Sequence, residues 1–239
     1  MVRVLQGELA FPPPESAGPL GIVAIGGTCS AERLILAYSQ GIFPWPHEGL
    51  PMLWFSPDPR FVLEPQHAHV SRSLKKRIAQ DVYDVRADTA FAEVMRGCAE
   101  ASRPNQDGTW ITDELMEGYA ALHALGYAHS IEAWQSNELV GGLYGVALGS
   151  LFFGEAMFAK QPDASKVAFA TLLGNLIAWD YTLVDCQTPT DHLARFGAKR
   201  WPRDRFLEHL RQHVIDPTQQ GPWELQLGPR DALARLPRR

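Results

Sequence analysis

Two polar residues, Asp185 and Gln187, end a short apolar run at residues 183–187 that reads LVDCQ. If this run is a strand, residues two apart point to the same face, and Cys186 between them points to the other. A carboxylate and a carboxamide at the end of a buried strand are costly to desolvate. The pair therefore either holds a loop by hydrogen bonds or faces a reacting group, and the residues alone leave both interpretations open.

Other kinds of chemistry have weaker support. Alternation directs the thiol of Cys186 into the core together with Val184, which disfavours a cysteine nucleophile working with His192. No CxxC, HExxH or GxxxxGK[ST] motif occurs. Two histidine pairs could share a face without a third ligand nearby in sequence: His67 with His69, and His209 with His213. We therefore expect neither a metal ion nor a cofactor.

The stretch before the polar pair is rich in glycine and aromatic residues. Residues 141–158 read GGLYGVALGSLFFGEAMF and carry a single acid, Glu155. Gly154 within this stretch predicts a β-bulge or a close backbone approach. Glu155 and Met157 are two apart, so regular alternation would place both on one face of a strand.

The elements that must position these residues follow from hydrophobic periodicity and from capping residues. Ser30 and Thr112 are candidate N-caps, and Gly41 and Gly126 are candidate helix ends. The expected helices are 30–41, 69–80, 89–101, 112–126, 164–180 and one beginning at 202. The expected strands are 21–25, 61–65, 83–88, 128–134, 139–149, 151–158 and 181–187. Residues 42–60 predict a rigid, irregular loop, and the tail beyond Val214 predicts loose packing.

This order of elements predicts an α+β fold, in which a mixed sheet has helices on both faces. We place a domain boundary near residue 60, which divides the chain into a small N-terminal domain at 1–60 and a main domain at 61–239. A dense basic run lies in the expected helix at 69–80: Arg72, Lys75, Lys76 and Arg77. Such a run is either an ordinary solvated helix face or a surface that contacts phosphates.

Composition limits the possible functions. The 239 residues are 46% hydrophobic and carry a net charge of −5, so a nucleic-acid site must be a local basic surface on an acidic protein. Three distant cysteines give no disulfide framework and indicate a reducing compartment. No apolar run reaches the ~18 residues of a membrane span, and the N-terminus does not resemble a signal peptide. We expect a cytoplasmic protein without membrane contact.

Ten collinear motifs together resemble the leucyl/phenylalanyl-tRNA–protein transferases of bacteria and cover roughly residues 11–210. In order they are IFPWP, LWFSPDPR, HVSRSLKK, TWIT, LHALGYAHSIEAW, ELVGGLYGVALG, FFGEAMF, DASK, DCQ and FGAKRWPR. The resemblance implies a GNAT-like acyltransferase domain behind a small N-terminal domain, in a monomer. It implies transfer of leucine or phenylalanine, with methionine as a further candidate, from leucyl-tRNA or phenylalanyl-tRNA. The acceptor would be a protein with N-terminal Arg or Lys, which the transfer marks for degradation.

The resemblance also implies roles for individual residues. Asp185 and Gln187 match the family's catalytic pair, which orients and deprotonates the attacking amine. Glu155 matches the acid that binds the N-terminal Arg or Lys of the acceptor. The aminoacyl side-chain pocket would comprise Leu143, Phe152, Gly154 and Met157. The tRNA would be bound by Trp45 and Trp110, which stack on its terminal adenosine, and by Arg72, Lys75, Lys76 and Arg77, which contact its phosphates.

The chain departs from the family pattern at several positions. It reads GGTCS at 26–30 where the family reads GGDLS, Ala156 replaces a serine beside Glu155, and Leu143 replaces a pocket methionine. Trp201 replaces a smaller apolar residue. Two alternatives from other classes are a CoA-dependent N-acetyltransferase of the same fold and a tRNA-binding module without activity. The first lacks its Q/R-x-x-G-x-G/A segment before residues 163–180, and the intact catalytic pair argues against the second.

Overall fold

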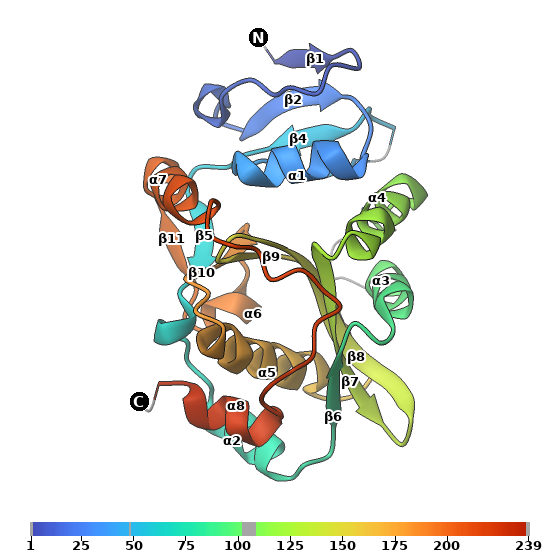
Figure 1. Ribbon diagram of the computed structural model, residues 1–239, viewed down its shortest axis with the longest axis vertical. Coiled ribbons are helices and arrows are strands. Elements are labelled where there is room, and N and C mark those ends of the chain that lie inside the picture. Colours follow the sequence, from blue (N-terminus) through green and yellow to red (C-terminus); the bar gives the residue numbers. More distant parts are fainter. Residues whose placement is uncertain (1, 48, 102–108, 238–239) are drawn as a thin grey trace.

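The structure, a computed structural model, describes residues 2–47, 49–101 and 109–237, and its strands form two sheets (Figure 1). The smaller sheet has the order β1-β2-β4-β3. Its strands are β1 (Arg3–Leu5), β2 (Ile22–Gly26), β3 (Phe43–Pro44) and β4 (Leu53–Phe55). Helix α1 (Ala31–Ser39) lies between this sheet and the rest of the molecule.

The main sheet has the order β11-β5-β10-β9-β8-β7-β6 within the described residues. Its strands are β5 (Arg60–Leu63), β6 (Asp84–Ala87), β7 (Ala128–Gln135), β8 (Glu138–Leu148), β9 (Leu151–Ala159), β10 (Leu183–Gln187) and β11 (Lys199–Trp201). Strands β9 and β10 are parallel, whereas the other neighbours pair antiparallel. A parallel pair needs a long crossover, and α5 (Ala164–Ala178) provides it.

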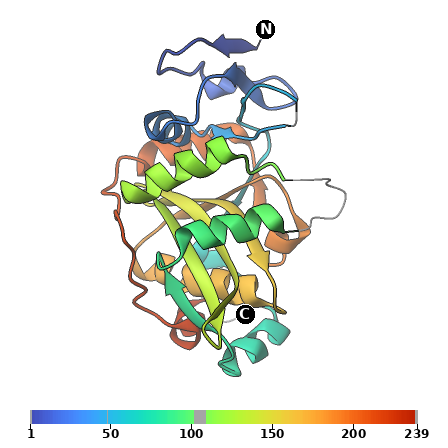
Figure 2. The ribbon, with the colours of Figure 1, turned by 90° about the vertical axis from the view of Figure 1, so that its right-hand side faces the viewer.

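Helices cover both faces of the main sheet. One face carries α1, α3 (Phe91–Glu100) and α4 (Asp113–Ala124), and Figure 2 shows α3 and α4 crossing in front of the strands. The other face carries α5, with α2 (Arg72–Ala79) and α8 (Pro229–Arg235) packed near it. Shorter elements complete the chain: the 3-10 helices Pro14–Ser16 and Pro65–His67, α6 (Asp191–Ala194) and α7 (Arg203–His213). The predicted α+β architecture with helices on both faces is confirmed.

Local signals predicted most of the helices correctly. The Ser30 side chain accepts a hydrogen bond from the backbone N–H of Arg33, as an N-cap does, and Thr112 accepts one from Leu115. Gly41, which follows α1, has a φ of +74°, the left-handed conformation that ends helices. No described helix is both long and apolar enough to cross a membrane.

Two expectations about irregular segments are wrong. Residues 42–60 contain β3, β4 and the start of β5, because Leu53–Phe55 pairs with β2 and Phe43–Pro44 pairs with β4. Pro44 fits there since β3 is an edge strand, where a missing N–H costs nothing. The tail is also well packed: Trp223 is buried and stacks on His129 at 3.8 Å between ring centroids. The Asn175 side chain accepts hydrogen bonds from the backbone N–H groups of residues 226 and 227.

The smaller sheet ends at Phe55 and the main sheet begins at Arg60, so the boundary predicted near residue 60 falls between them. The two parts nevertheless share a core. Tyr38 of α1 packs against Phe153 of β9, with their ring centroids 5.1 Å apart, and both side chains are fully buried. The division into two domains stays a prediction.

Candidate active site

Asp185 lies near the end of β10 and is fully buried, with both carboxylate oxygens bound by one arginine. Arg60 Nε donates to Asp185 Oδ1 at 2.8 Å, and Arg60 Nη2 donates to Oδ2 at 2.6 Å. The third guanidinium nitrogen, Nη1, donates to the carbonyl of Gly41 at 3.0 Å. The rings of Phe43 and Phe206 lie 4.7 and 4.5 Å from the guanidinium carbon. This forked ion pair in an aromatic setting fixes the carboxylate in place as an anion.

Gln187 ends β10 in an unusual conformation. Its φ is +60°, and the pairing of β10 with β5 shifts by one residue between Asp185 and Gln187, so that Cys186 is bulged. The backbone N–H of Gln187 donates to Asp185 Oδ1 at 2.9 Å. Its side-chain Nε2 donates to Glu155 Oε1 at 2.8 Å. Asp185 thus positions the backbone of Gln187, and Glu155 orients its amide.

Glu155 differs from Asp185 because the donors that bond it are neutral. Tyr119 Oη donates to Glu155 Oε2 at 2.8 Å, and the hydroxyls of Tyr38 and Tyr119 are hydrogen-bonded at 2.5 Å. Burial raises the pKa of Glu155 to about 7; hydrogen bonds from the tyrosine hydroxyls oppose this shift, and the charge of Asp185 adds to it. A carboxyl group that titrates near neutral pH is therefore in direct contact with Gln187.

A β-bulge, rather than regular alternation, decides where Glu155 points. Tyr144 of β8 pairs with Ala156, and the next residue, Gly145, pairs with Gly154, so Glu155 has no partner on β8. The expectation that Glu155 and Met157 share one face is therefore wrong. Glu155 reaches Tyr119 of α4, whereas Met157 packs on the other side of the sheet, in the core that includes α5. The bulge that the glycine pattern predicted does occur beside Gly154.

Alternation holds for the residues before the bulge of β10. Val184 and Cys186 are buried in the core on the α5 side. Burial, followed by the charge of Asp185, raises the pKa of the Cys186 thiol well above its usual value. A thiol in this state is a poor nucleophile. The interpretation of Cys186 as a core residue is confirmed.

The four residues expected to line the aminoacyl pocket lie around β8 and β9. Leu143 and Phe152 are buried in the core beneath α5, with 2% and 0% of their surface exposed. Gly154 and Met157 are half-buried, and Met157 is paired with Leu143 across the two strands. The structure brings these residues near one another, but on the opposite face from the carboxylate of Glu155.

The two tryptophans expected to stack on adenosine are both half-buried. Trp45 follows β3 and packs against Phe43 and Phe55, with ring centroids 6.5 and 5.5 Å away. Trp110 comes shortly after residues 102–108, which lie outside the described residues. The stacking role of both side chains stays a prediction.

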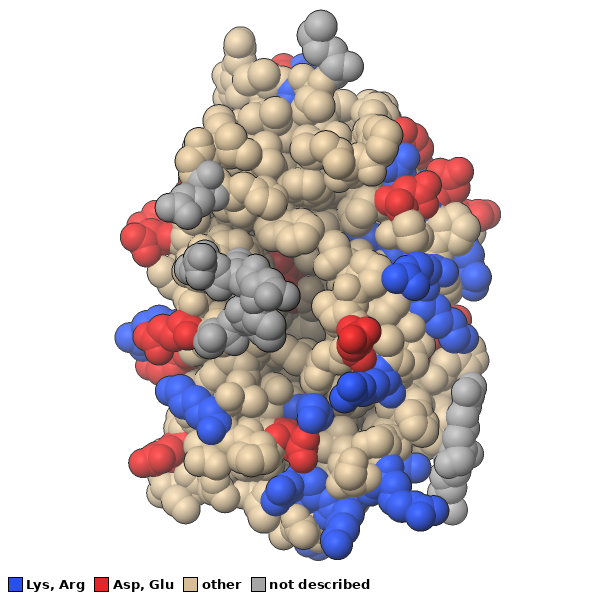
Figure 3. Space-filling view, turned by 180° about the vertical axis from the view of Figure 1, so that it is seen from behind, with Lys and Arg blue, Asp and Glu red and all other residues tan. Residues whose placement is uncertain are grey.

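The basic run forms α2, whose N-cap is Ser71. Arg72 and Lys76 are exposed, whereas Lys75 and Arg77 are half-buried. Arg77 Nε lies 3.8 Å from a carboxylate oxygen of Asp163, so part of its charge is already compensated. Figure 3 shows Lys and Arg side chains gathered at the lower end of the molecule, where α2 lies, and a hollow in the middle of the same face.

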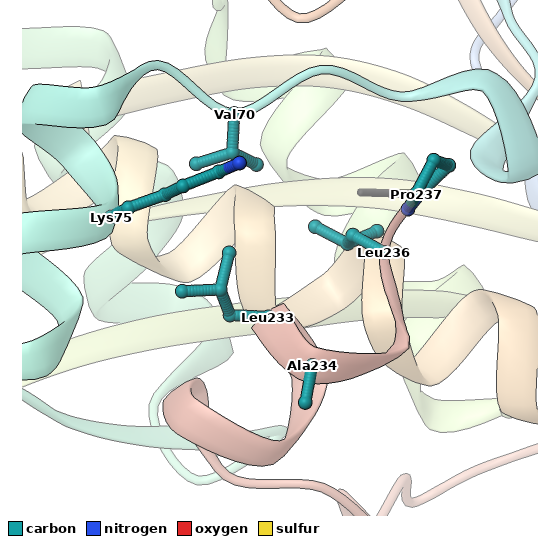
Figure 4. Close-up of a pocket in the computed structure, with 6 residues that line it drawn as sticks. All are labelled: Val70, Lys75, Leu233, Ala234, Leu236 and Pro237. Atoms are coloured by element: carbon teal, nitrogen blue, oxygen red, sulfur yellow. The ribbon is translucent and has the colours of Figure 1, made fainter. Parts of the chain in front are cut away.

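Lys75 also borders a cavity of about 210 Å³ between α2 and α8. In Figure 4 its side chain extends toward Val70, and the C-terminal segment closes the other side. The residues that line the cavity are Val70, Lys75, Leu233, Ala234, Leu236 and Pro237. Lys75 is half-buried because its side chain lies along this largely apolar cavity.

Sequence reasoning missed three side chains that shape the site: Arg60, Tyr119 and Tyr38. Arg60 stands in the LWFSPDPR motif, but nothing in its local context indicates a partner 125 residues away. The tyrosines occupy apolar faces of α1 and α4 and resemble core residues in the sequence. Among the described residues, no group of three or more His, Cys, Asp and Glu side chains is arranged to hold a metal ion.

Comparison with known proteins gives a consistent result. Residues 62–211 match the family described as leucyl/phenylalanyl-tRNA protein transferase, and residues 27–58 match the N-terminal domain of that family. The chain is 57% identical to a leucyl/phenylalanyl-tRNA–protein transferase of Myxococcus xanthus, over 89% of this chain and 91% of that protein. It is 54% identical to the same-named protein of an Anaeromyxobacter species, over 96% and 98% of the two chains.

Another such relative, from Stutzerimonas stutzeri, is 53% identical over 88% of this chain and 94% of that protein. Among solved structures, L-PGS from Bacillus licheniformis matches 68% of this chain and 55% of that chain with 13% identity and a TM-score of 0.39. A likeness this low carries no argument about the fold.

Proposed function

The chain belongs to the leucyl/phenylalanyl-tRNA–protein transferase family, and on this premise we propose that it transfers leucine or phenylalanine from aminoacyl-tRNA to the N-terminus of acceptor proteins. The observation that carries this proposal is the hydrogen-bonded row of Asp185, Gln187 and Glu155, which joins the end of β10 to the bulge in the middle of β9. The row combines a fixed anion, an oriented amide and a carboxyl group that titrates near neutral pH.

The reaction is the attack of a neutral amine on the ester carbonyl of the charged tRNA. Nitrogen forms a bond to the carbonyl carbon, the bond from that carbon to the ribose oxygen breaks, and the proton lost by the amine ends on the leaving ribose oxygen, directly or through water. Because the ester is already activated, no covalent enzyme intermediate is needed. The enzyme contributes by positioning the amine, by removing its proton and by stabilising the developing oxyanion.

Gln187 is the residue that we assign to the amine. Because its Nε2 donates to Glu155, its amide oxygen Oε1 points elsewhere, and among the described residues it accepts no hydrogen bond. This oxygen can accept a hydrogen bond from the attacking amine. Asp185 is a positioning residue: Arg60 occupies both of its oxygens, so it holds the Gln187 backbone rather than taking a proton.

Glu155 is the residue that we assign to the acceptor's side chain. An N-terminal Arg or Lys carries a cation, and a half-buried carboxylate would pair with it more strongly than one in open solvent. A nearby cation would also lower the pKa of Glu155 and favour its charged form. Such pairing would explain a preference for Arg and Lys among acceptor N-termini. Glu155 is hydrogen-bonded to the side-chain amide of Gln187, so the bound acceptor would also lie close to that amide.

The donor contacts in this proposal are those that the sequence predicted. The slot for the Leu or Phe side chain would be formed by Leu143, Phe152, Gly154 and Met157. Because Leu143 and Phe152 are buried on the α5 side, their side chains would have to move to make this slot accessible from the site. The terminal adenosine would stack on Trp45 and Trp110, and α2 would contact tRNA phosphates. We further propose that the main domain is GNAT-like and that the protein acts as a cytoplasmic monomer.

The test is an assay for transfer of radioactive leucine from leucyl-tRNA to a peptide that begins with Arg. We expect labelled peptide with the free N-terminus and none with the same peptide acetylated at its N-terminus. A parallel assay with labelled acetyl-CoA tests the N-acetyltransferase alternative. Binding of tRNA without any transfer would contradict the proposal and leave the non-catalytic tRNA-binding module.

A further inference from the structure

A second basic surface surrounds β11, at the edge of the main sheet. Four side chains make up this β11 surface, and all of them are exposed: Arg195, Lys199, Arg200 and Arg205. In Figure 3 basic residues gather on the right-hand side, where β11 and α7 lie, next to the hollow of that face. This surface is separate from α2, which lies at the lower end of the molecule.

These cations differ from most exposed arginines of the protein in having no acidic partner. Among the described residues none of the four is within 4.0 Å of a carboxylate oxygen, although Asp191, Asp204 and Glu208 occur in α6 and α7. Of the six other exposed arginines in the described residues, four form ion pairs, Arg3, Arg96, Arg211 and Arg230, whereas Arg72 and Arg235 do not. The guanidinium of Arg205 instead lies over the ring of Trp201, 3.7 Å from its centroid. A stacked guanidinium keeps the N–H groups at its edge available to an anion.

The register of the sheet places the β11 surface next to the catalytic amide. Lys199 and Arg200 of β11 pair with Val62 and Phe61 of β5, which pair on their other side with Asp185 and Gln187 of β10. Because paired residues share a face of the sheet, Lys199 lies on the face of Asp185, whereas Arg200 starts on the α5 side at the edge of the sheet. Two steps between neighbouring strands therefore separate the backbones of β11 and β10, which is roughly 10 Å. The next residue along β11, Trp201, pairs with Arg60, which binds the positioning residue Asp185.

The chemistry of the donor identifies what would occupy this surface. The aminoacyl ester is attached to the last nucleotide of the tRNA, so the terminal phosphates must pass close to Gln187 when the ester is in reach of the amine. The acceptor, with its cationic N-terminus, would be repelled by the same side chains. On a protein with a net charge of −5, unpaired cations at this place suit a polyanion.

We propose that the β11 surface binds the phosphates of the donor's terminal nucleotides, and that it holds the single-stranded 3′ end while α2 contacts more distant parts of the tRNA. This inference rests on the proposed function. Basic residues on an edge strand have a second explanation, because they also prevent sheets from pairing edge to edge. The two explanations differ in what they predict for RNA binding.

The experiment compares a double variant, Lys199→Gln with Arg200→Gln, with a control of equal charge change on other surfaces, Arg3→Gln with Arg96→Gln. A third variant changes Arg72, Lys75 and Lys76 of α2 to Gln. Binding is measured at several salt concentrations with two RNAs, full-length tRNA and a short single strand with the same 3′ end. Transfer is measured with an aminoacyl-adenosine donor, which has no phosphate.

We expect the β11 variant to bind both RNAs more weakly and to reduce the slope of log K against log salt by about 0.7 for each lost contact on a single strand. The α2 variant should weaken binding of full-length tRNA alone, and the control should match wild type. All variants should use aminoacyl-adenosine at the wild-type rate, which shows that they are folded and that the site is intact.

Two results would count against the inference, and they differ from failure of the proposed function. If the β11 variant gives salt lines parallel to wild type with equal affinity for both RNAs, the cations serve only to protect the edge strand. If it weakens full-length tRNA but not the short strand, the surface does not contact the 3′ end. If wild type transfers nothing from any donor, the proposed function itself fails.

Discussion

The two faces of β10 hold their side chains by different forces. On one face Asp185 is fixed by the charge of Arg60, and Gln187 is fixed by hydrogen bonds to two carboxylates. On the other face Val184 and Cys186 are fixed by packing beneath α5, a helix that is buried on nearly all sides. Side chains on the polar face are positioned by directional hydrogen bonds and an ion pair, and those on the apolar face by packing. Substitutions that change side-chain volume by similar amounts should therefore differ between the two faces in their effects on stability and on transfer rate.

The polar face contains a second contrast, between its two acids. Asp185 is paired with a cation, whereas Glu155 is hydrogen-bonded to tyrosine and glutamine. The first arrangement pairs a carboxylate with a buried guanidinium, and in the second burial raises the pKa of the acid to about 7, so its charge can change near neutrality. A fixed anion suits positioning, and a titrating one suits recognition of a substrate cation.

The largest effect is expected at the buried ion pair. Asp185→Ala leaves the buried Arg60 without its partner, which should lower the free energy of unfolding by roughly 3–5 kcal/mol. Urea unfolding measures this loss. A double variant, Asp185→Leu with Arg60→Met, should recover much of the stability yet remain inactive, because the hydrogen bond to the Gln187 backbone is absent. A stable Asp185→Ala protein would show that packing, rather than charge pairing, fixes this face.

Changes at Gln187 should affect the rate more than the stability. We expect Gln187→Ala to slow single-turnover transfer by roughly 10²–10³-fold, the usual cost of removing one preorganised polar group. Gln187→Asn is the matched control, since asparagine tolerates the φ of +60° but is one methylene too short to bridge to Glu155. It should fold normally and be nearly as slow. Wild-type rates in either variant would contradict the role of the oriented amide.

The pH dependence should distinguish the two acids. Transfer to an Arg-initiated peptide should rise with pH through about 7 as Glu155 loses its proton. Glu155→Gln should raise the KM for that peptide and remove this part of the profile. The rise that comes from ionisation of the peptide's own amine should remain. A profile that does not change in the variant would show that Glu155 does not titrate in the working enzyme.

The same group also links stability to pH. Folding raises the pKa of Glu155 from 4.5 to about 7, so between these values the folded protein binds more protons than the unfolded chain. The contribution of Glu155 to stability is therefore present below pH 4.5 and lost as the pH rises through about 7. The free energy of unfolding, measured from pH 4.5 to 8, should lose this pH-dependent contribution in the Glu155→Gln variant. In Tyr119→Phe, which removes a hydrogen bond to the carboxylate, the pKa of Glu155 should rise further and the pH-dependent loss of stability should extend to higher pH.

The smallest effect is expected on the apolar face. Cys186→Ser replaces a buried thiol by a hydroxyl on the α5 side and should lower the free energy of unfolding by about 1–3 kcal/mol. The transfer rate should stay that of wild type, because this side chain points away from Gln187. A folded but inactive Cys186→Ser protein would mean that the two faces are not functionally separate.

Much of the fold was predictable from local sequence signals. Ser30 and Thr112 specified the starts of their helices through their own side chains, and alternation placed Cys186 correctly. Asp185 and Gln187 stand out as polar residues at the end of an apolar run, and Glu155 stands out as the single acid in a stretch rich in glycine and aromatic residues. These inferences needed only neighbours in sequence.

The remaining features depend on partners that are distant in sequence. Arg60 and Asp185 meet only because β5 and β10 are adjacent strands. The bulge at Glu155 breaks the alternation that would have placed Glu155 and Met157 on one face of β9. Gly154 indicates that a bulge can occur, but the sequence does not reveal to which face the extra residue turns. The polar composition of the tail predicts loose packing, but Asn175, which is distant in sequence, accepts the hydrogen bonds that hold it.

The position of that tail has a consequence for how the protein is made. Asn175 and Asp88 are synthesised well before their hydrogen-bonding partners, which are backbone N–H groups of Trp223, Gln226 and Leu227. While the chain is still emerging from the ribosome, α5 lacks its outer layer, and polar groups meant for the tail stay exposed to water. Native packing of this half of the molecule is therefore completed only once residues 223–227 are available, and a chain that stops before them exposes the apolar surface by which quality-control proteases distinguish unfinished products.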